Sequence, residues 1–340
     1  MVGAGLRLAS LAFSLVLALG LAVLAVGVSA IRSPGPSTAD TLVVLPRGSG
    51  LNTIAAVLHR ERVVAHPQMF ALYVRLTGDA DALRAGEYRF PAGITAAEVA
   101  SQLVDGRTHK RRLTVPEGFT TERVLSLVAE APALAGEVPR TIAQGALLPE
   151  TYQYEWGDTR AGLLARMQAA QSQLLASLWA ARAPGLPLQT VEQAVILASI
   201  VERETGVASE RARVAGVFHN RLRRGMRLQS DATVEYGLKL RGRPDGVALT
   251  RDDLEADHPY NTYRINGLPP GPIANPGRAA LEAVLHPADT NELYFVADGN
   301  GGHAFAATID EHNRNVVRYR ATRVVPEARP LSDAGPQRLD

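Results

Sequence analysis

The chain has 340 residues, a formal net charge of +2 and no cysteine. This length suits one or two domains with cores of their own, and the near balance of charge indicates no nucleic-acid partner. The lack of cysteine excludes disulfides, thiol nucleophiles and cysteine-ligated metal centres, but it leaves the redox compartment undecided.

An uncharged and overwhelmingly apolar run covers residues 8–31. It exceeds the ~18 residues expected of a membrane-spanning helix and the ~7–15-residue core of a cleavable signal. We therefore expect residues 1–32 to be a cytoplasmic stub and a single transmembrane anchor. A removed signal peptide is the alternative, because Val28-Ser29-Ala30 resembles a small-residue cleavage site. In either case the soluble part is exported, behind a Pro/Ser/Gly-rich linker at 33–40.

Residues 41–115 predict a small α+β module. Thr95, followed three residues later by Glu98, has the pattern of a capping box at the start of a helix. The alternation of strands and helices over this stretch is typical of one compact unit. The expected strands are 41–46, 83–90 and 110–115, and the expected helices are 51–61, 66–76 and 96–103.

Residues 116–320 predict a larger unit of helices with a few strands, followed by a polar, Pro-rich tail at 321–340. Its expected helices are 118–133 with Thr120 as N-cap, 159–182, 191–205, 209–224 and 312–319, and its expected strands are 292–297 and 304–308. The segment 226–237 is expected to be extended and polar. The segment 257–276 is dense in Asn, Pro, Gly and Tyr, and irregular loops of that length are uncommon unless they are functional.

Glu202 is the most informative single residue. Stepping about 100° per residue along helix 191–205, it continues the apolar row of Val191, Val195 and Ala198. A carboxylate on a buried helix face is costly unless it is paired, hydrogen-bonded or protonated. Glu202 is therefore a candidate acid with a raised pKa. An ordinary ion pair with an arginine is the structural alternative.

Several kinds of catalytic site have no signature in the chain. There is no Gly-rich phosphate loop, dinucleotide fingerprint, H-E-x-x-H or Gly-x-Ser-x-Gly sequence, and the histidines are scattered, so we expect neither a cofactor nor a metal. What remains is acid–base chemistry on carboxylates. Asp231 and Asn261 lie in segments able to flank Glu202, and Tyr260 and Tyr263 suit stacking on sugar rings. The loop 147–154 suits sugar stacking and core packing equally.

Several motifs resemble those of the MltG (YceG-like) endolytic murein transglycosylases. Ile196 to Thr205 resembles the family signature, and the match extends from the membrane span to about Tyr319. Further segments that carry it are 209–211, 217–222, 226–231, 233–237, 260–263, 267–277, 286–287 and 294–297. Two departures are Ala232, where the family usually has proline, and Gln144-Gly145, where it usually has Glu-Gly.

The resemblance implies an anchor in the inner membrane with the enzyme in the periplasm. It implies a LysM-like subdomain at 41–115 and a catalytic domain at 116–320 that cleaves the MurNAc–GlcNAc bond of nascent glycan strands, leaving 1,6-anhydroMurNAc ends. Glu202 would be the general acid/base, since a single Glu suffices when the sugar's own hydroxyl replaces water. Candidates for gripping the glycan or orienting Glu202 are Gln229, Ser230, Asp231, Tyr260, Asn261, Tyr263 and Asn275.

Two alternatives stay open from the sequence. Glu204 is the rival catalytic residue, and its structural role would be a salt bridge with Arg211 or another nearby arginine. The rival function is a non-catalytic glycan-binding scaffold that recruits cell-wall synthases, and it does not require a carboxylate at position 202.

Overall fold

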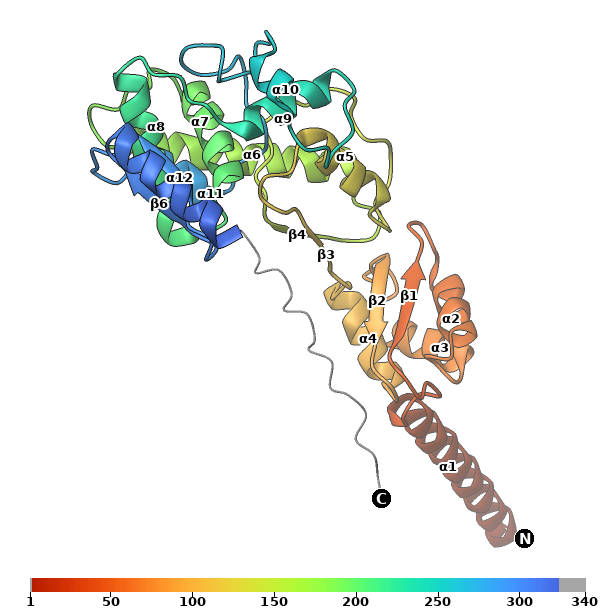
Figure 1. Ribbon diagram of the computed structural model, residues 1–340. Coiled ribbons are helices and arrows are strands. Elements are labelled where there is room, and N and C mark those ends of the chain that lie inside the picture. The colour runs from red at the N-terminus through yellow and green to blue at the C-terminus, as the bar shows by residue number, and fades with distance from the viewer. Residues whose placement is uncertain (1, 324–340) are drawn as a thin grey trace, which may run out of the picture. The chain divides into compact units, whose positions relative to one another are not determined.

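The structure, a computed structural model, describes residues 2–323 (Figure 1), so most of the tail predicted at 321–340 lies outside the described residues. The chain forms two compact units. The first consists of residues 1–113, 131–136 and 153–160. The second consists of residues 114–130, 137–152 and 161–340.

The apolar N-terminal run forms one continuous helix, α1 (Val2–Arg32). Its segment Phe13–Arg32 has a mean hydropathy of 2.5, and within the part of the chain that the structure describes it is the one helix long and apolar enough to cross a membrane. Large apolar side chains along it are exposed, among them Leu15 and Val23. Such an uncovered apolar surface suits lipid better than water.

The first unit has the element order that the sequence predicts. β1 and β2 pair antiparallel with Thr41 opposite Phe90 and Leu45 opposite Gly86, and the helices pack around them. The predicted capping box is confirmed, because Thr95 N donates to Glu98 Oε2 (2.9 Å) and Glu98 N donates to Thr95 Oγ1 (3.3 Å). The elements are β1 (Thr41–Leu45), α2 (Leu51–Arg60), α3 (Pro67–Leu76), β2 (Gly86–Phe90), α4 (Ala96–Asp105) and β3 (Arg111–Thr114).

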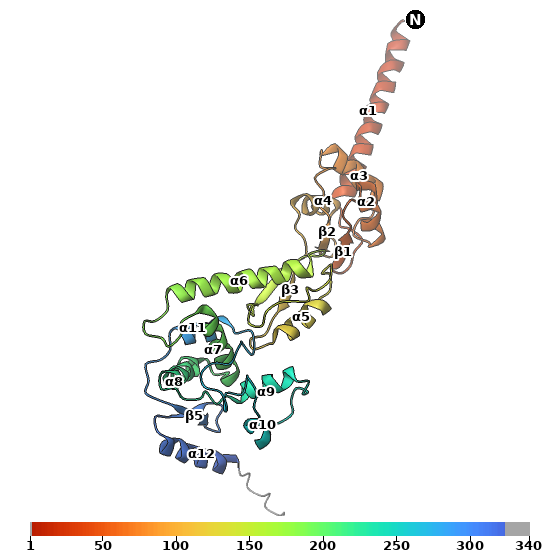
Figure 2. The same ribbon diagram turned by 90° about the horizontal axis from the view of Figure 1, so that it is seen from above.

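The second unit is built around α7 (Val191–Glu204), which α8, α9 and α11 enclose (Figure 2). Every residue from Ala194 to Val201 is buried, as expected of a helix covered on several sides. Thr190 caps its start by accepting from Gln193 N. The other elements are α5 (Thr121–Glu130), β4 (Thr151–Tyr154), α6 (Arg160–Ala180), η1 (Ala208–Glu210), α8 (Arg211–Arg223), α9 (Asp231–Leu240), α10 (Arg251–Glu255), α11 (Arg278–Leu285), β5 (Tyr294–Ala297), β6 (His303–Ala306) and α12 (Ile309–Arg323).

One expected element is wrong. Residues 226–237 were expected to be extended, but α9 begins at Asp231 and runs through most of that segment. Thr233, Val234 and Gly237 are its buried positions, so a helical face packs against the core although these three residues are weak helix formers. The acidic Asp231 in the first turn also suits a helix N-terminus.

Other departures are smaller. Residues 151–154 of the expected loop form β4, which pairs with β3, while α10 and α11 had no sequence prediction. The final helix is longer than expected at both ends. The irregular character of 257–276 is confirmed, since this segment contains no helix or strand.

Candidate active site

Glu202 occupies the last turns of α7, and its side chain is only 4% exposed, which confirms the predicted buried position. Its Oε2 accepts a hydrogen bond from Gly277 N at 2.8 Å. Gly277 is the N-cap residue of α11, so the carboxylate faces the positive end of a helix dipole. The irregular segment is fastened to α7 one turn earlier, where Ile273 N donates to Ser199 Oγ at 3.0 Å.

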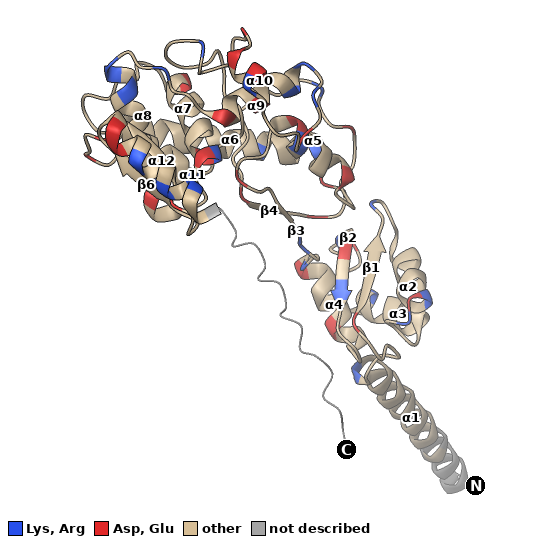
Figure 3. Cartoon of the chain, viewed as in Figure 1, with Lys and Arg blue, Asp and Glu red and all other residues tan. Residues whose placement is uncertain are grey.

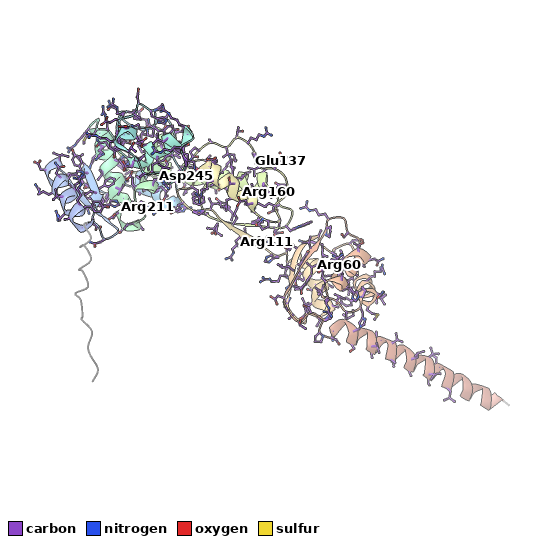
Figure 4. All side chains as sticks on the ribbon, turned by 45° about the vertical axis from the view of Figure 1, so that its right-hand side comes forward. Arg60, Arg111, Glu137, Arg160, Arg211 and Asp245 are labelled. Atoms are coloured by element: carbon purple, nitrogen blue, oxygen red, sulfur yellow. The ribbon has the colours of Figure 1, made fainter. Side chains whose placement is uncertain are left out.

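A second carboxylate, Glu117, lies beside Glu202 although the two are far apart in sequence. Arg211 Nη2 lies 3.6 Å from Glu202 Oε1 and 3.8 Å from Glu117 Oε2, and its side chain is 12% exposed (Figure 4). A Cβ atom at position 277 would lie 1.9 Å from Glu117 Oε1. Only glycine therefore allows Glu117 and Gly277 to approach this closely.

The surroundings of Glu202 act on its pKa in both directions. Burial raises the pKa above its ordinary value, and the charge of Glu117 acts the same way. The hydrogen bond from Gly277 and the charge of Arg211 act against this, but the net direction is upward. A carboxyl with a raised pKa is able to give a proton near neutral pH and later take one back.

Glu204 belongs to a different network. Its Oε1 accepts from Ser230 Oγ, and burial raises its pKa, with Asp231 adding to the rise and Ser230, His303 and Arg221 opposing it. Among the described residues, Glu204 forms no salt bridge with Arg211 or with another arginine, and Arg211 lies beside Glu202 and Glu117 instead.

The two polar segments that the sequence marked as candidates do come together. Ser230 N donates to Thr262 Oγ1 (2.9 Å), and Tyr263 OH donates to Asp231 Oδ1 (2.6 Å). Gln229 joins the same two segments, because its backbone N donates to Thr262 O at 3.1 Å. These bonds join the start of α9 to the irregular segment next to Glu204.

Asn261 and Asn275 are almost fully buried, and their side chains bind backbone. Asn261 Nδ2 donates to the carbonyl oxygens of Asp253, Leu254 and Ala256. Asn275 Oδ1 accepts from Leu147 N, and its Nδ2 donates to Phe119 O, both at 3.0 Å. The amide groups proposed to grip a ligand are thus engaged within the protein. The Tyr260 ring packs against Tyr236 with 5.1 Å between centroids.

An open groove of about 500 Å³ runs beside the acid. Glu202 itself does not line the groove, but Gly118 and Arg203 do, and a Cβ on Gly118 would lie 3.8 Å from Glu202 Cγ. The groove lies between the segment before α5, the exposed side of α9 and the loop 243–249. Among residues 2–323, no group of three or more His, Asp or Glu side chains is placed to hold a metal ion.

Sequence reasoning missed Glu117 and the role of Arg211. Glu117 stands in a turn ahead of α5 and belongs to no periodic pattern, so only the tertiary approach of Gly277 reveals it. The only signal in the sequence was a carboxylate directly before a glycine in a Pro-containing turn, which is common in turns without function.

The fold is thus a mixed helix-and-strand fold with an N-terminal apolar helix, and its second unit holds buried carboxylates beside an open groove. The chain belongs to the YceG-like family, whose model matches residues 43–318. It is 30% identical over 306 residues to the endolytic murein transglycosylase of Bacillus subtilis (strain 168), covering 81% of this chain and 83% of that protein.

Two further proteins extend the comparison. The endolytic murein transglycosylase of Streptococcus pneumoniae (strain ATCC BAA-255 / R6) is 30% identical over 323 residues, and the match covers 82% of this chain but only 58% of that longer protein. A crystal structure of the yceG-like protein lmo1499 from Listeria monocytogenes superposes with a TM-score of 0.50 at 28% identity, covering 82% of this chain and 99% of that one.

Proposed function

We propose that the protein is an endolytic peptidoglycan lytic transglycosylase in which Glu202 is the general acid/base. The observation that carries the proposal is a buried carboxyl with a raised pKa at the edge of an open groove. The names of the related proteins support the same reaction and the same substrate.

The proposed reaction needs one carboxyl group and no water. Protonated Glu202 gives its proton to the glycosidic oxygen as the bond between C1 of MurNAc and that oxygen breaks. The resulting carboxylate then takes the proton of the C6 hydroxyl of the same sugar while O6 bonds to C1. The products are a 1,6-anhydroMurNAc end and a free GlcNAc hydroxyl, so atoms and charge balance.

The neighbours of Glu202 suit the two halves of this cycle. Burial and Glu117 favour the protonated form needed for the first step, whereas Gly277 N–H and Arg211 stabilise the carboxylate that the first step leaves. In this scheme Glu117 and Arg211 are positioning residues. Glu204 and Ser230 hold the end of α7 to the start of α9, while Gln229, Asp231, Tyr260 and Tyr263 are proposed to support the groove wall.

The organisation of the whole chain is also a proposal. We assign residues 1–32 to an anchor in the inner membrane, 33–40 to a linker, 41–115 to a LysM-like glycan-binding subdomain and 116–320 to the catalytic domain. The exposed apolar surface of α1 and the compact β1–β2 module with three helices support these assignments. The catalytic domain would then act in the periplasm, where cell-wall synthases are its natural partners.

The test uses the full chain in detergent micelles with uncrosslinked glycan strands, and products are analysed by mass spectrometry. Wild type, Glu202→Gln and Glu192→Gln are compared. Glu192 is an exposed glutamate in the first turn of the same helix, so its substitution is a matched control.

We expect wild type and Glu192→Gln to release products lighter by one water at the MurNAc end, and Glu202→Gln to release none while still binding strands. Hydrolysed ends would contradict the lytic mechanism and indicate an ordinary glycosidase with a second carboxylate. Intact strands with every variant, together with retained binding, would favour the non-catalytic scaffold.

A further inference from the structure

The groove continues into a second cavity of about 360 Å³. Gly118 and Arg203, the groove residues next to Glu202, do not line the second cavity, whereas Gln144 and Glu122 do. It therefore extends away from the acid. The residues that line both cavities are Thr120, Tyr236, Lys239, Arg243, Pro244 and Asp245.

Lys239 and Arg243 line both cavities, and Arg123 lines the groove beside them. Figure 3 shows basic and acidic segments interleaved around α5, α9 and α10. Arg243 is paired with Asp253 at 2.6 Å, so its charge is already used. The Arg123 guanidinium lies 4.5 Å over the Phe119 ring and, among the described residues, has no carboxylate partner. Lys239 Nζ lies 2.9 Å from Asp245 Oδ2 and 3.9 Å from the exposed Glu122.

Asp245, which is labelled in Figure 4, is the carboxylate that pairs with Lys239. It comes from the loop between α9 and α10, and its side chain is 65% exposed. The hydrogen bond and charge of Lys239, with the charges of Arg123 and Arg203, lower its pKa. An ion pair this exposed contributes little to stability, so a carboxylate from a ligand is able to replace it.

A polar group without a partner belongs to Gln144, which lines the second cavity together with Lys239. Gln144 Oε1 accepts from Thr121 N at 2.8 Å, which fixes the orientation of the amide. Its Nε2 is buried and has no hydrogen-bond partner. Buried donors are nearly always satisfied, so an ordered water or a ligand acceptor that enters beside Gln144 would complete its hydrogen bonding.

We propose that Lys239, Arg123 and Gln144 form a carboxylate-binding subsite for the peptide stem of the glycan strand, for which Asp245 competes from within the chain. This inference rests on the proposed function. The stem branches from MurNAc, the sugar whose bond breaks, so a strand with its scissile bond at Glu202 must place a stem nearby. The stem carries free carboxylates, which match an ammonium, a guanidinium and an amide donor.

The test measures equilibrium binding, so it does not depend on cleavage. Fluorescently labelled, uncrosslinked strands are titrated with the full-length Glu202→Gln protein in detergent micelles. Three strands are compared: one with free stem carboxylates, the same strand after chemical amidation of those carboxylates, and a strand stripped of stems that carries free lactyl carboxylates. Lys239→Gln, Asp245→Asn and the control Arg251→Gln are added singly. Arg251 is exposed, lies on α10 and lines neither cavity.

We expect the parent protein to bind the free-stem strand about tenfold more tightly than the amidated strand. Lys239→Gln should reduce that preference to about twofold, and Asp245→Asn should tighten free-stem binding about two- to fivefold by removing the competitor. Arg251→Gln should keep the parent preference.

Equal weakening of all strands by Lys239→Gln, or no tightening by Asp245→Asn, would overturn the subsite. Binding of the stripped strand as tight as that of the free-stem strand would assign the carboxylate to the lactyl group and overturn the stem assignment. If wild type fails to cleave any strand, the proposed reaction is wrong, and the stem preference still decides the subsite on its own.

Discussion

A substitution at Asn275 tests whether this residue stabilises the fold or binds the glycan. It is fully buried, and its side chain joins three separate segments: the residues before α5, the stretch before β4 and the irregular segment. Asn275→Ala removes the hydrogen-bond acceptor of Leu147 N, a buried donor that makes no other hydrogen bond within the described part of the chain. Phe119 O keeps one partner, because the backbone N of residue 275 also donates to it at 2.9 Å.

The expected cost follows from this inventory. One orphaned buried N–H costs about 1–3 kcal/mol, and the space left by the side chain adds about 1 kcal/mol. The free energy of unfolding of the second unit should therefore fall by about 2–4 kcal/mol. With a urea m-value of about 2 kcal/mol/M for a unit of this size, the midpoint should fall by roughly 1–2 M.

The assay is urea unfolding followed by tryptophan fluorescence in a Trp156→Phe background, which leaves Trp179 on α6 to report on the second unit. Asn291→Ala is the control, because Asn291 is exposed in the same unit and should change stability by no more than about 0.5 kcal/mol. Strand binding by the folded variant should stay near the wild-type value. An unchanged urea midpoint together with weaker binding of glycan strands would show that Asn275 contacts the glycan and does not stabilise the fold.

Three further predictions concern proton equilibria. A general acid must carry its proton, so activity is lost as the pH rises through the pKa of Glu202. Glu117 raises the pKa of Glu202, so Glu117→Gln should move the basic limb of kcat/KM to lower pH. Arg211 lowers that pKa, so Arg211→Gln should move the limb to higher pH. A shift in the same direction for both variants would contradict the assignment of the limb to Glu202. Gly277→Ala should displace the Glu117 carboxylate and therefore move the basic limb of kcat/KM to lower pH, as Glu117→Gln does. The same series of pH–rate measurements checks this shift. Burial lowers the pKa of His219 to about 4, so between roughly pH 6.5 and 4 the unfolded state binds a proton that the folded state does not. The free energy of unfolding should therefore fall by about 3 kcal/mol as the pH drops through that window. In urea titrations at several pH values, His219→Gln should lack most of this pH dependence, and an identical dependence in both proteins would refute the prediction.

Local patterns were enough to predict much of the fold. The capping box at Thr95 and the apolar period of α7 both report on neighbours within a few residues along the chain, and both are confirmed. The buried position of Glu202 followed from the same period, because a helix face is fixed by residue spacing alone.

Interactions between distant segments could not be predicted in this way. Thr233 and Val234 favour strands, and their packing against the core on one face of α9 outweighs that preference. Glu117 and Glu202 meet at Arg211 through the tertiary fold, with Gly277 leaving room for the Glu117 carboxylate. From the sequence, Asn261 and Asn275 are candidates for gripping the glycan or orienting Glu202. In the structure both side chains hydrogen-bond backbone groups, as a buried segment without a helix or strand requires.

The irregular segment also determines the chemistry of the acid. Three alternate backbone N–H groups donate in turn from Ile273 to Ser199 Oγ, from Asn275 to Phe119 O and from Gly277 to Glu202 Oε2. The first two bonds fix the third, because an extended stretch held at alternate residues has little freedom at the next one. The hydrogen bond that stabilises the Glu202 carboxylate therefore depends on packing two and four residues earlier. A substitution that loosens this stretch should shift the pKa of Glu202 upward before it unfolds the domain, since the lost bond is the largest of the effects that lower that pKa.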